Sequence, residues 1–313
     1  MILEMLRKGP NHLIRLRHPR LLTIDHPLEE SNDCLAFATE PVTIGLANIL
    51  GNYDNLPSPL PLTIKEYEVH PIEIQYGLYN LSEALEFLHC GVKLMHGNIT
   101  PEVVVVTAGG TWKLMGFNFC CHSQYQSETT TTFQFQEWDS RRPHDTNPSL
   151  DFLAPEYVLT KSCSEKSDVF SFGMLCYSVY NGGRPLCSSL NNLLSFKQNV
   201  ETISRVTESG LGEVPHGLRT LVRTMLAVEP SVRPDAMEIS KHAFFDEVGV
   251  ATLRYLDTLY EKGDMERSQY FRKPGSCHHK TSKESNSPEG NSGSKTRIQK
   301  QQDGSVCPCP SFF

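Results

Sequence analysis

One segment in the middle of the chain limits the possible folds more than any other. Residues 168–180 read DVFSFGMLCYSVY and are apolar on nearly every side of a helix. A helix on a protein surface keeps one polar side, so this pattern predicts a helix that is buried all round. Other elements must surround it, and a chain of 313 residues, 39% of them hydrophobic, can supply them in one sizeable domain.

Two further segments have the spacing of amphipathic helices. In the first, Leu78, Leu81, Leu85 and Leu88 form one stripe, and Gly91 is placed to end the helix. The second ends before Pro230, and its stripe consists of Leu218, Leu221, Val222, Met225 and Leu226. Both helices offer an apolar face that can pack against the buried helix.

A short hairpin is expected between the first two of these helices. The β-branched run at 103–106 predicts a strand, Ala108-Gly109-Gly110 predicts the turn, and residues 112–115 predict the returning strand. Residues 119–153 then form a polar stretch that is too long for a simple connection. Such loops are typically functional or mobile.

Charge and hydropathy exclude several classes of protein. The chain carries 29 Lys and Arg against 36 Asp and Glu, a net charge of -7, which argues against a nucleic-acid partner. Its N-terminus lacks the layout of a signal peptide, and no apolar stretch approaches the roughly 20 residues that cross a bilayer. We expect a cytoplasmic protein whose membrane association is at most peripheral.

The cysteines and histidines predict no cofactor or metal site. The ten cysteines contain no C-x-x-C pair, and Cys277-His278-His279 lacks further ligands at suitable spacing. We expect thiols in a reducing compartment.

The order of the elements resembles the C-terminal lobe of a protein kinase. A helix is followed by a loop with His96, a short hairpin, a polar loop ending at Ala154-Pro155-Glu156, and a buried helix opening at Ser167-Asp168. The resemblance implies an α+β, protein kinase-like fold. It would have a mostly α C-lobe, an incomplete N-lobe of αC and two strands, and a disordered C-terminal tail.

Positions on both sides of these elements extend the resemblance. His18-Pro19 closes what looks like the αC helix, and Thr39 and Glu40 look like the gatekeeper and the hinge. Arg233 stands where the family pairs an Arg with the Glu of Ala-Pro-Glu, which is Glu156 here.

The residues that match the family at these positions would keep the shape of the lobe. The resemblance implies that Glu156 and Arg233 form a buried ion pair, which is costly to break on one side only. It also implies that Asp168 caps the buried helix and holds the backbone of the His96 loop.

Several short strings resemble one family in particular, the SCY-like pseudokinases, and within it the coated-vesicle-associated member. These strings are RLRHPRLL, HPLEES, NLPSP, HGNITPE and EWD, and the resemblance covers residues 1 to about 271. In that family a kinase-like domain precedes helical repeats and a long region that contacts clathrin and adaptors. The resemblance therefore implies protein partners from the clathrin-coat and adaptor machinery, and a location on coated vesicles, Golgi or endosomes.

Four segments are expected on this basis. Residues 1–45 are a remnant of the N-lobe and hinge, 46–246 the C-lobe, 247–271 an amphipathic helical extension, and 272–313 a disordered tail. The tail carries seven Lys and Arg against three acids and little apolar content. The extension either binds a partner, or docks back onto the domain or onto helical repeats of the kind that follow it in the family. Its apolar and aromatic residues are Val248, Leu253, Tyr255, Leu256, Leu259 and Tyr260.

The family's catalytic loop has lost its base in this sequence. Phosphoryl transfer requires a phosphate cradle, a Lys held by a Glu, metal ligands and a carboxylate that orients the substrate hydroxyl. The cradle and the Lys would precede αC and are not found, and the position of the αC Glu is Gly9. His96-Gly97-Asn98 replaces His-Arg-Asp, and the neutral amide of Asn98 has no basic lone pair.

The metal ligands are missing as well. Val103 stands where the family has an Asn, and Gly116-Phe117-Asn118 replaces Asp-Phe-Gly. Mg²⁺ prefers hard oxygen ligands with at least one carboxylate. Gly97 replaces the Arg that binds an activation-loop phosphate, so phosphorylation at 129–132 should not activate the domain by that route.

Three hypotheses follow from these losses. The first is a catalytically inactive pseudokinase that serves as a protein-interaction module in clathrin-coated vesicle and endosomal trafficking. The second is an atypical kinase that binds ATP in an unconventional way. The third is an unstable truncated isoform or fragment, because an incomplete N-lobe leaves sheet edge and apolar surface uncovered.

Overall fold

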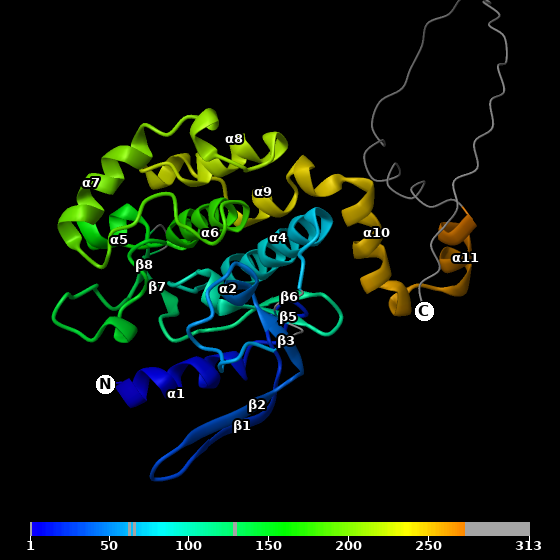
Figure 1. Cartoon of the computed structure of the whole chain (residues 1–313), viewed down its shortest axis with the longest axis horizontal. Helices are drawn as coiled ribbons and strands as arrows, with labels where there is room; N and C mark the ends of the chain where they lie inside the picture. Colours follow the sequence, from blue (N-terminus) through cyan, green and yellow to red (C-terminus); the bar gives the residue numbers. More distant parts are fainter. Residues whose placement is uncertain (1, 62–63, 65–66, 128–129, 273–313) are drawn as a thin grey trace, which may run out of the picture.

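The computed structural model describes residues 2–61, 64, 67–127 and 130–272 (Figure 1). A mostly helical part, green to yellow in Figure 1, lies beside a smaller part in which a blue helix accompanies short strands. This architecture confirms the predicted fold class. Beyond Arg272, the predicted disordered tail lies outside the described residues. None of the helices within them is long and apolar enough to cross a membrane.

The helix at the centre of the helical part is α6 (Glu165–Tyr180). Phe172, Met174 and Cys176 are each 1% exposed, as the all-apolar pattern predicts. The predicted cap at Asp168 is wrong, because the helix begins one turn earlier. The Ser164 hydroxyl accepts a hydrogen bond from the Lys166 amide at 3.2 Å and forms a capping box with Ser167.

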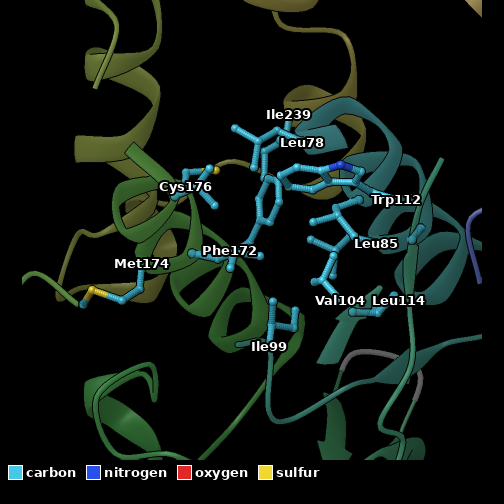
Figure 2. Close-up of a cluster of buried hydrophobic side chains, with 14 of the residues drawn as sticks. Leu78, Leu85, Ile99, Val104, Trp112, Leu114, Phe172, Met174, Cys176 and Ile239 are labelled. Atoms are coloured by element: carbon cyan, nitrogen blue, oxygen red, sulfur yellow. The ribbon is translucent and has the colours of Figure 1, made fainter. Parts of the chain in front are cut away.

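The first predicted leucine helix is α4 (Pro71–Glu86), which continues into a π-helical turn (Phe87–Gly91). Its four leucines are at most 2% exposed. Figure 2 shows Leu78 and Leu85 packed together with Phe172 of α6 and with Trp112. A Cβ atom at Gly77 would lie 2.1 Å from the Trp112 ring, so only glycine allows this approach.

The predicted hairpin forms the core of a three-stranded antiparallel sheet. Strands β5 (Val104–Thr107) and β6 (Trp112–Leu114) pair with each other, and β3 (Val42–Gly45) pairs with the other edge of β5. Val103, which was assigned to the first strand, instead ends a 3-10 turn at Pro101–Val103.

The polar stretch at 119–153 contains a second hairpin that the sequence pattern did not predict. Strands β7 (Cys121–Ser127) and β8 (Thr130–Phe133) pair in antiparallel fashion, and β7 also pairs with β4 (Leu94–Met95). These strands consist mainly of Ser, Thr and Gln, so no alternation of apolar residues marks them. Pairing with β4, which is distant in sequence, decides their conformation.

The smaller part begins with α1 (Ile2–Leu13) and the antiparallel pair β1 (Ile24–Glu30) and β2 (Leu35–Thr39). One helix and two strands were predicted for residues 1–45, and the structure adds a third strand there, β3, which pairs with β5. However, α1 ends at Leu13, so His18-Pro19 does not close it. The His18 ring instead stacks on Phe87 with the ring centroids 4.6 Å apart, which places the linking segment against the end of α4.

Shorter helices and turns make up the rest of the part that the structure describes. The remaining α-helices are α2 (Leu46–Ile49), α5 (Pro155–Leu159), α7 (Leu193–Ser204), α8 (His216–Met225), α9 (Ala236–Ser240), α10 (Val248–Asp257) and α11 (Asp264–Arg272). The 3-10 turns are His144–Thr146, Glu208–Leu211, Pro230–Val232, Ala243–Asp246 and Leu259–Glu261. Helix α8 carries the second predicted apolar stripe and packs on α6.

Helix α10 of the predicted extension contacts α4 and the segment before β1. Partner binding by this helix stays a prediction. The Arg20 guanidinium binds Asp257 at the end of α10 at 2.7 Å and Glu83 of α4 at 2.8 Å. The Arg254 guanidinium lies 4.4 Å from the centroid of the Tyr79 ring. These contacts join α10, α4 and the segment that precedes β1.

Candidate functional site

The loop with His96 is held by a buried carboxylate of α6. One Asp168 oxygen accepts a hydrogen bond from the His96 amide at 2.6 Å, and the other accepts one from the Gly97 amide at 2.8 Å. The His89 Nε2 atom lies 3.0 Å from the same carboxylate, whose residue is 1% exposed. Asp168 thus holds the loop backbone from inside the first turn of α6.

The His96 ring links this loop to the segment at 115–117. Burial lowers the pKa of His96, so the ring is neutral. Nε2 lies 2.9 Å from the Met115 carbonyl and therefore carries the proton, which leaves Nδ1 to accept from the Asn98 amide at 3.4 Å. The His96 ring also packs edge-on against the Phe117 ring, with the ring centroids 4.8 Å apart. These are packing and hydrogen-bonding roles.

Asn98, at the position of the family's base, binds the backbone of the chain. Its Oδ1 atom accepts a hydrogen bond from the Ser149 amide at 2.9 Å. The amide therefore ties the His96 loop to the end of the polar segment, shortly before Ala154-Pro155-Glu156. Ser149 has no side-chain signal in the sequence that would predict this contact, because the bond uses only its backbone.

Val103 and Gly116, which the resemblance predicts at metal-ligand positions of the family, interlock and pack tightly against each other. A Cβ atom at Gly116 would lie 2.5 Å from Val103 Cγ1, well inside any real contact distance. Gly116 has φ +82°, which residues with a side chain adopt rarely. The Met115 amide donates to the Val103 carbonyl at 2.8 Å, so the backbone fixes the two residues side by side. The Val103 side chain therefore fills the space that a side chain at residue 116 would need.

A second interlock joins α1 to the same segment. A Cβ atom at Gly9 would lie 2.6 Å from Asn118 Oδ1, so Asn118 occupies the space of any side chain at Gly9. Asn118 Nδ2 donates to the Met5 carbonyl at 3.2 Å. The two positions, both predicted as losses, thus form one contact between α1 and the residue that follows Phe117.

The gatekeeper and hinge candidates lie at the end of β2. Thr39 donates through its hydroxyl to the Glu40 carbonyl at 3.0 Å. The Glu40 carboxylate binds the Lys113 amine at 2.6 Å and accepts from the Thr23 amide at 2.7 Å. Burial acts to raise the pKa of Glu40, but these hydrogen bonds from Lys113 and Thr23 outweigh it and lower that pKa. Sequence reasoning missed Lys113, which sits between buried positions of β6 without a distinguishing pattern.

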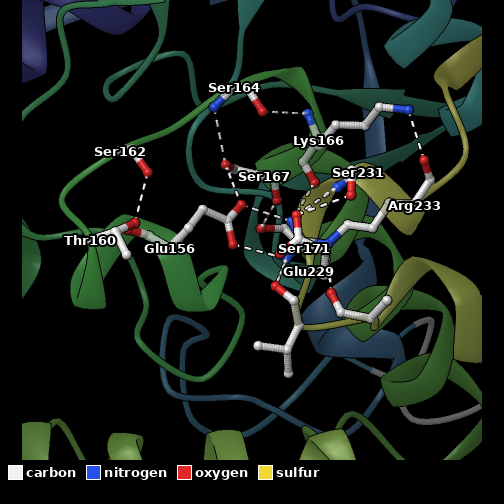
Figure 3. A network of polar contacts seen from close by, with 12 residues as sticks. Glu156, Thr160, Ser162, Ser164, Lys166, Ser167, Ser171, Glu229, Ser231 and Arg233 are labelled. Atoms are coloured by element: carbon white, nitrogen blue, oxygen red, sulfur yellow. Dashed lines mark hydrogen bonds and ion pairs between the residues drawn. The ribbon is translucent and has the colours of Figure 1, made fainter.

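Glu156 and Arg233 form a bidentate pair, which Figure 3 shows at the centre of a polar network. Their two N–O distances are 2.7 and 2.8 Å, and the Arg233 side chain is 0% exposed. Ser167 donates to the Glu156 carboxylate at 2.7 Å, and the Lys166 amine donates to the Arg233 carbonyl at 2.7 Å. The network joins α5, α6 and the turn before α9.

The space between α1 and the 116–118 segment offers no metal centre. A cavity of about 200 Å³ lies there, lined in part by Lys8, Asn118 and Gln136. The Lys8 amine already donates to the Cys120 carbonyl at 2.7 Å. In the part of the chain that the structure describes, no group of three or more His, Cys, Asp or Glu could hold a metal ion.

Comparison with known proteins gives a consistent match. Residues 10–245 match the protein kinase domain. The chain is 46% identical to human SCY1-like protein 2 over 273 residues. This aligned segment covers 87% of this chain and 29% of that protein.

Two more distant relatives resemble the chain over a similar range. Protein kinase domain-containing protein ppk32 of Schizosaccharomyces pombe is 35% identical, with 86% of this chain and 36% of that protein covered. A Dictyostelium discoideum relative that is named a probable inactive serine/threonine-protein kinase, scy1, is 24% identical, with 87% and 28% covered. The chain thus spans about a third or less of the length of these relatives.

Proposed function

Since this chain belongs to the protein kinase family, we propose that it is a catalytically inactive kinase-like domain that serves as a protein-interaction module. The observation that carries the proposal is the Val103 and Gly116 interlock, with 2.5 Å between Val103 Cγ1 and a Cβ atom placed at residue 116. A protein that used Mg²⁺ at this position would need a carboxylate there, and the packing leaves no room for one.

The other replaced positions support the same proposal. A phosphoryl-transfer site keeps its polar groups free to meet metal, phosphate and substrate. Here Asn98 is bound to the Ser149 backbone, and Asn118 is bound to the backbone of α1. We infer that Gly9, Gly97, Asn98, Val103, Gly116 and Asn118 are structural positions, as are Thr39, Glu40, Glu156, Asp168 and Arg233.

We propose a role in clathrin-coated vesicle and endosomal trafficking for this module. The basis is the resemblance of its sequence strings to the coated-vesicle-associated member of the SCY-like family, so the role is an analogy and not a property of a site. Its partners would be proteins of the coat and adaptor machinery. A cytoplasmic location with peripheral membrane contact fits this role.

The experiment that tests inactivity is a thermal melt with Mg-ATP. A ligand that binds only the folded state raises the melting temperature, and at 100 times its Kd it adds about 2.7 kcal/mol. We expect no shift at millimolar Mg-ATP, with a conventional kinase domain as the positive control. A clear Mg-dependent stabilisation would instead support the atypical ATP-binding kinase.

The same melt without ligand tests the unstable-fragment alternative. A single cooperative transition is expected, because α4 and α6 share one continuous apolar core. A broad transition with strong binding of an apolar dye at room temperature would favour the unstable product.

A further inference from the structure

Two cysteines from distant parts of the chain meet in the core. Cys121 begins β7, and Cys163 directly precedes Ser164, the N-cap residue of α6. The two cysteines are 42 positions apart in the numbering of the chain, yet their thiols form a hydrogen bond with each other. Both side chains pack in one apolar cluster with Tyr157, and both thiols are free.

The backbone on each side of this pair is held by its own hydrogen bonds. Cys121 lies in the ladder between β7 and β4. On the other side, the Ser162 amide donates to the Glu156 carbonyl at 3.2 Å. Figure 3 shows the Ser162 hydroxyl bound to that of Thr160, 2.8 Å away, and Ser164 at the start of α6. The two sulfur atoms thus belong to two separately anchored segments, which a disulfide would tie together.

The surroundings of Cys163 decide which thiol donates the hydrogen bond. The hydrogen bond to Cys121 and burial both raise the pKa of Cys163, and the negative charges of Asp168 and Glu156 act in the same direction. Cys163 therefore keeps its proton and donates, and the Cys121 sulfur accepts. The thiolate is the reactive form of cysteine, so Cys163 is the later of the two to react.

The burial of the pair limits the class of oxidant that can reach it. Cys121 is 7% exposed, and Cys163 is half-buried. A bulky disulfide or an oxidising protein has no open access to a sulfur atom in such a position. Hydrogen peroxide is close to water in size and is the oxidant that fits this site.

We propose that Cys121 and Cys163 are a redox-responsive pair, which hydrogen peroxide converts into a disulfide between β7 and the start of α6. First, the Cys121 thiolate attacks a peroxide oxygen: an S–O bond forms, the O–O bond breaks, and the departing hydroxide takes up a proton to become water. The Cys163 sulfur then attacks the sulfenic sulfur: an S–S bond forms, the S–O bond breaks, and hydroxide leaves with the Cys163 proton as water. The two thiols lose two electrons, and the peroxide gains them.

The disulfide would hold the polar segment against the helical part. It closes a loop that contains most of residues 119–153 together with Ala154-Pro155-Glu156. Such a closure restricts the unfolded chain, so oxidation should stabilise the fold. Disulfides in a reducing compartment are usually transient and redox-sensing, and a cellular thiol reverses them by thiol–disulfide exchange. The proposal is independent of the catalytic state of the domain.

The first test locates the disulfide after the purified full chain has been treated with hydrogen peroxide. Remaining thiols are alkylated, and tryptic peptides are analysed by mass spectrometry without reduction. We expect peptide 162–166, in which Cys163 is the only cysteine, joined to peptide 114–141, which contains Cys120 and Cys121. Cys120 is the matched control, because its side chain packs in a different apolar cluster. Cys121→Ala should therefore abolish the joined peptide, and Cys120→Ala should retain it.

The second test compares the melting temperatures of the oxidised and reduced forms of the same protein. We expect oxidation to raise the melting temperature by at least about 4 °C, and dithiothreitol to reverse the rise. Cys163→Ser should show no such difference, whereas Cys187→Ser, which removes another half-buried thiol, should retain it. Because each variant is compared with itself, a less stable variant still gives a result.

Four results would overturn the proposal. Peptide 162–166 recovered only with an alkylated or overoxidised Cys163 would show that no disulfide forms. A joined peptide that persists in Cys121→Ala would assign the bond to Cys120, and one found only in a covalent dimer would assign it to two chains. A joined peptide without a rise in melting temperature would exclude the stabilising link.

Discussion

Two sets of residues in the molecule have opposite chemistry. In the charged set, the carboxylates of Asp168 and Glu156 are buried and each accepts several hydrogen bonds. In the neutral set, Val103 packs against Gly116, and Asn118 packs against Gly9. The charged set joins the His96 loop, α5, α6 and the turn before α9, whereas the positions that the resemblance predicts for catalysis carry neutral residues that contact one another. We propose that the shape of this fold depends on a different set of residues from its catalysis.

The largest effect is expected from breaking the Glu156–Arg233 ion pair of the charged set. Arg233→Ala leaves Glu156 as a buried, unpaired carboxylate and should lower the free energy of unfolding by about 3–5 kcal/mol. Urea unfolding measures this. The double variant Glu156→Gln with Arg233→Met is the control and should be less destabilised than Arg233→Ala. Equal free energies of unfolding for the two variants would mean that the unpaired Glu156 charge does not cause the loss of stability.

A smaller loss is expected from Asp168→Asn. One carboxylate oxygen becomes an NH₂ group that faces an amide donor of the His96 loop, so one buried donor loses its acceptor. The cost should be about 1–3 kcal/mol. Relative to the unsubstituted protein, the variant should exchange its His96 and Gly97 amide protons faster, while the amides of α8 serve as the internal control and should not change. Unchanged exchange at His96 and Gly97 would show that Asp168 does not hold the loop.

In the neutral set, Gly116→Asp places a carboxylate where the resemblance predicts a metal ligand of the family. It should destabilise the protein by about 1–3 kcal/mol, because the new Cβ collides with Val103. Val103→Ala removes the colliding methyl groups, so the double variant should be more stable than the sum of the single effects predicts. Strict additivity in urea unfolding would show that the interlock does not limit this position.

The smallest effect is expected from Asn98→Asp. The new carboxylate retains an acceptor for the Ser149 amide, so stability should change by no more than about 0.5 kcal/mol. The variant should transfer no phosphate to a generic protein substrate, since the metal positions are still absent. Measurable phosphate transfer from labelled ATP by Asn98→Asp, absent in Asn98→Ala, would mean that the neutral set belongs to a weakened active site.

Periodicity predicted most of the helical part, and it failed where pairing or capping is not local. The leucine stripe of α4 and the all-apolar α6 appear as expected, because burial imposes a spacing that can be read directly. Strands β7 and β8 were missed because they consist mainly of Ser, Thr and Gln without apolar alternation, and β7 in addition pairs with β4 from elsewhere in the chain. The start of α6 was misplaced because Ser164 is the N-cap residue, whereas Asp168, the predicted cap, lies inside the first turn of the helix.

For the candidate site, residue types alone determined which side-chain groups are absent at the predicted positions: a glycine carries no carboxylate, and a carboxamide is no general base. Only the tertiary structure decided what replaced it. The approach of Val103 to Gly116, of Gly9 to Asn118 and of Asn98 to Ser149 joins residues 13, 109 and 51 positions apart, by the numbering of the chain. Such contacts depend on the packing of α1 and the polar segment against the hairpin, which no local pattern encodes.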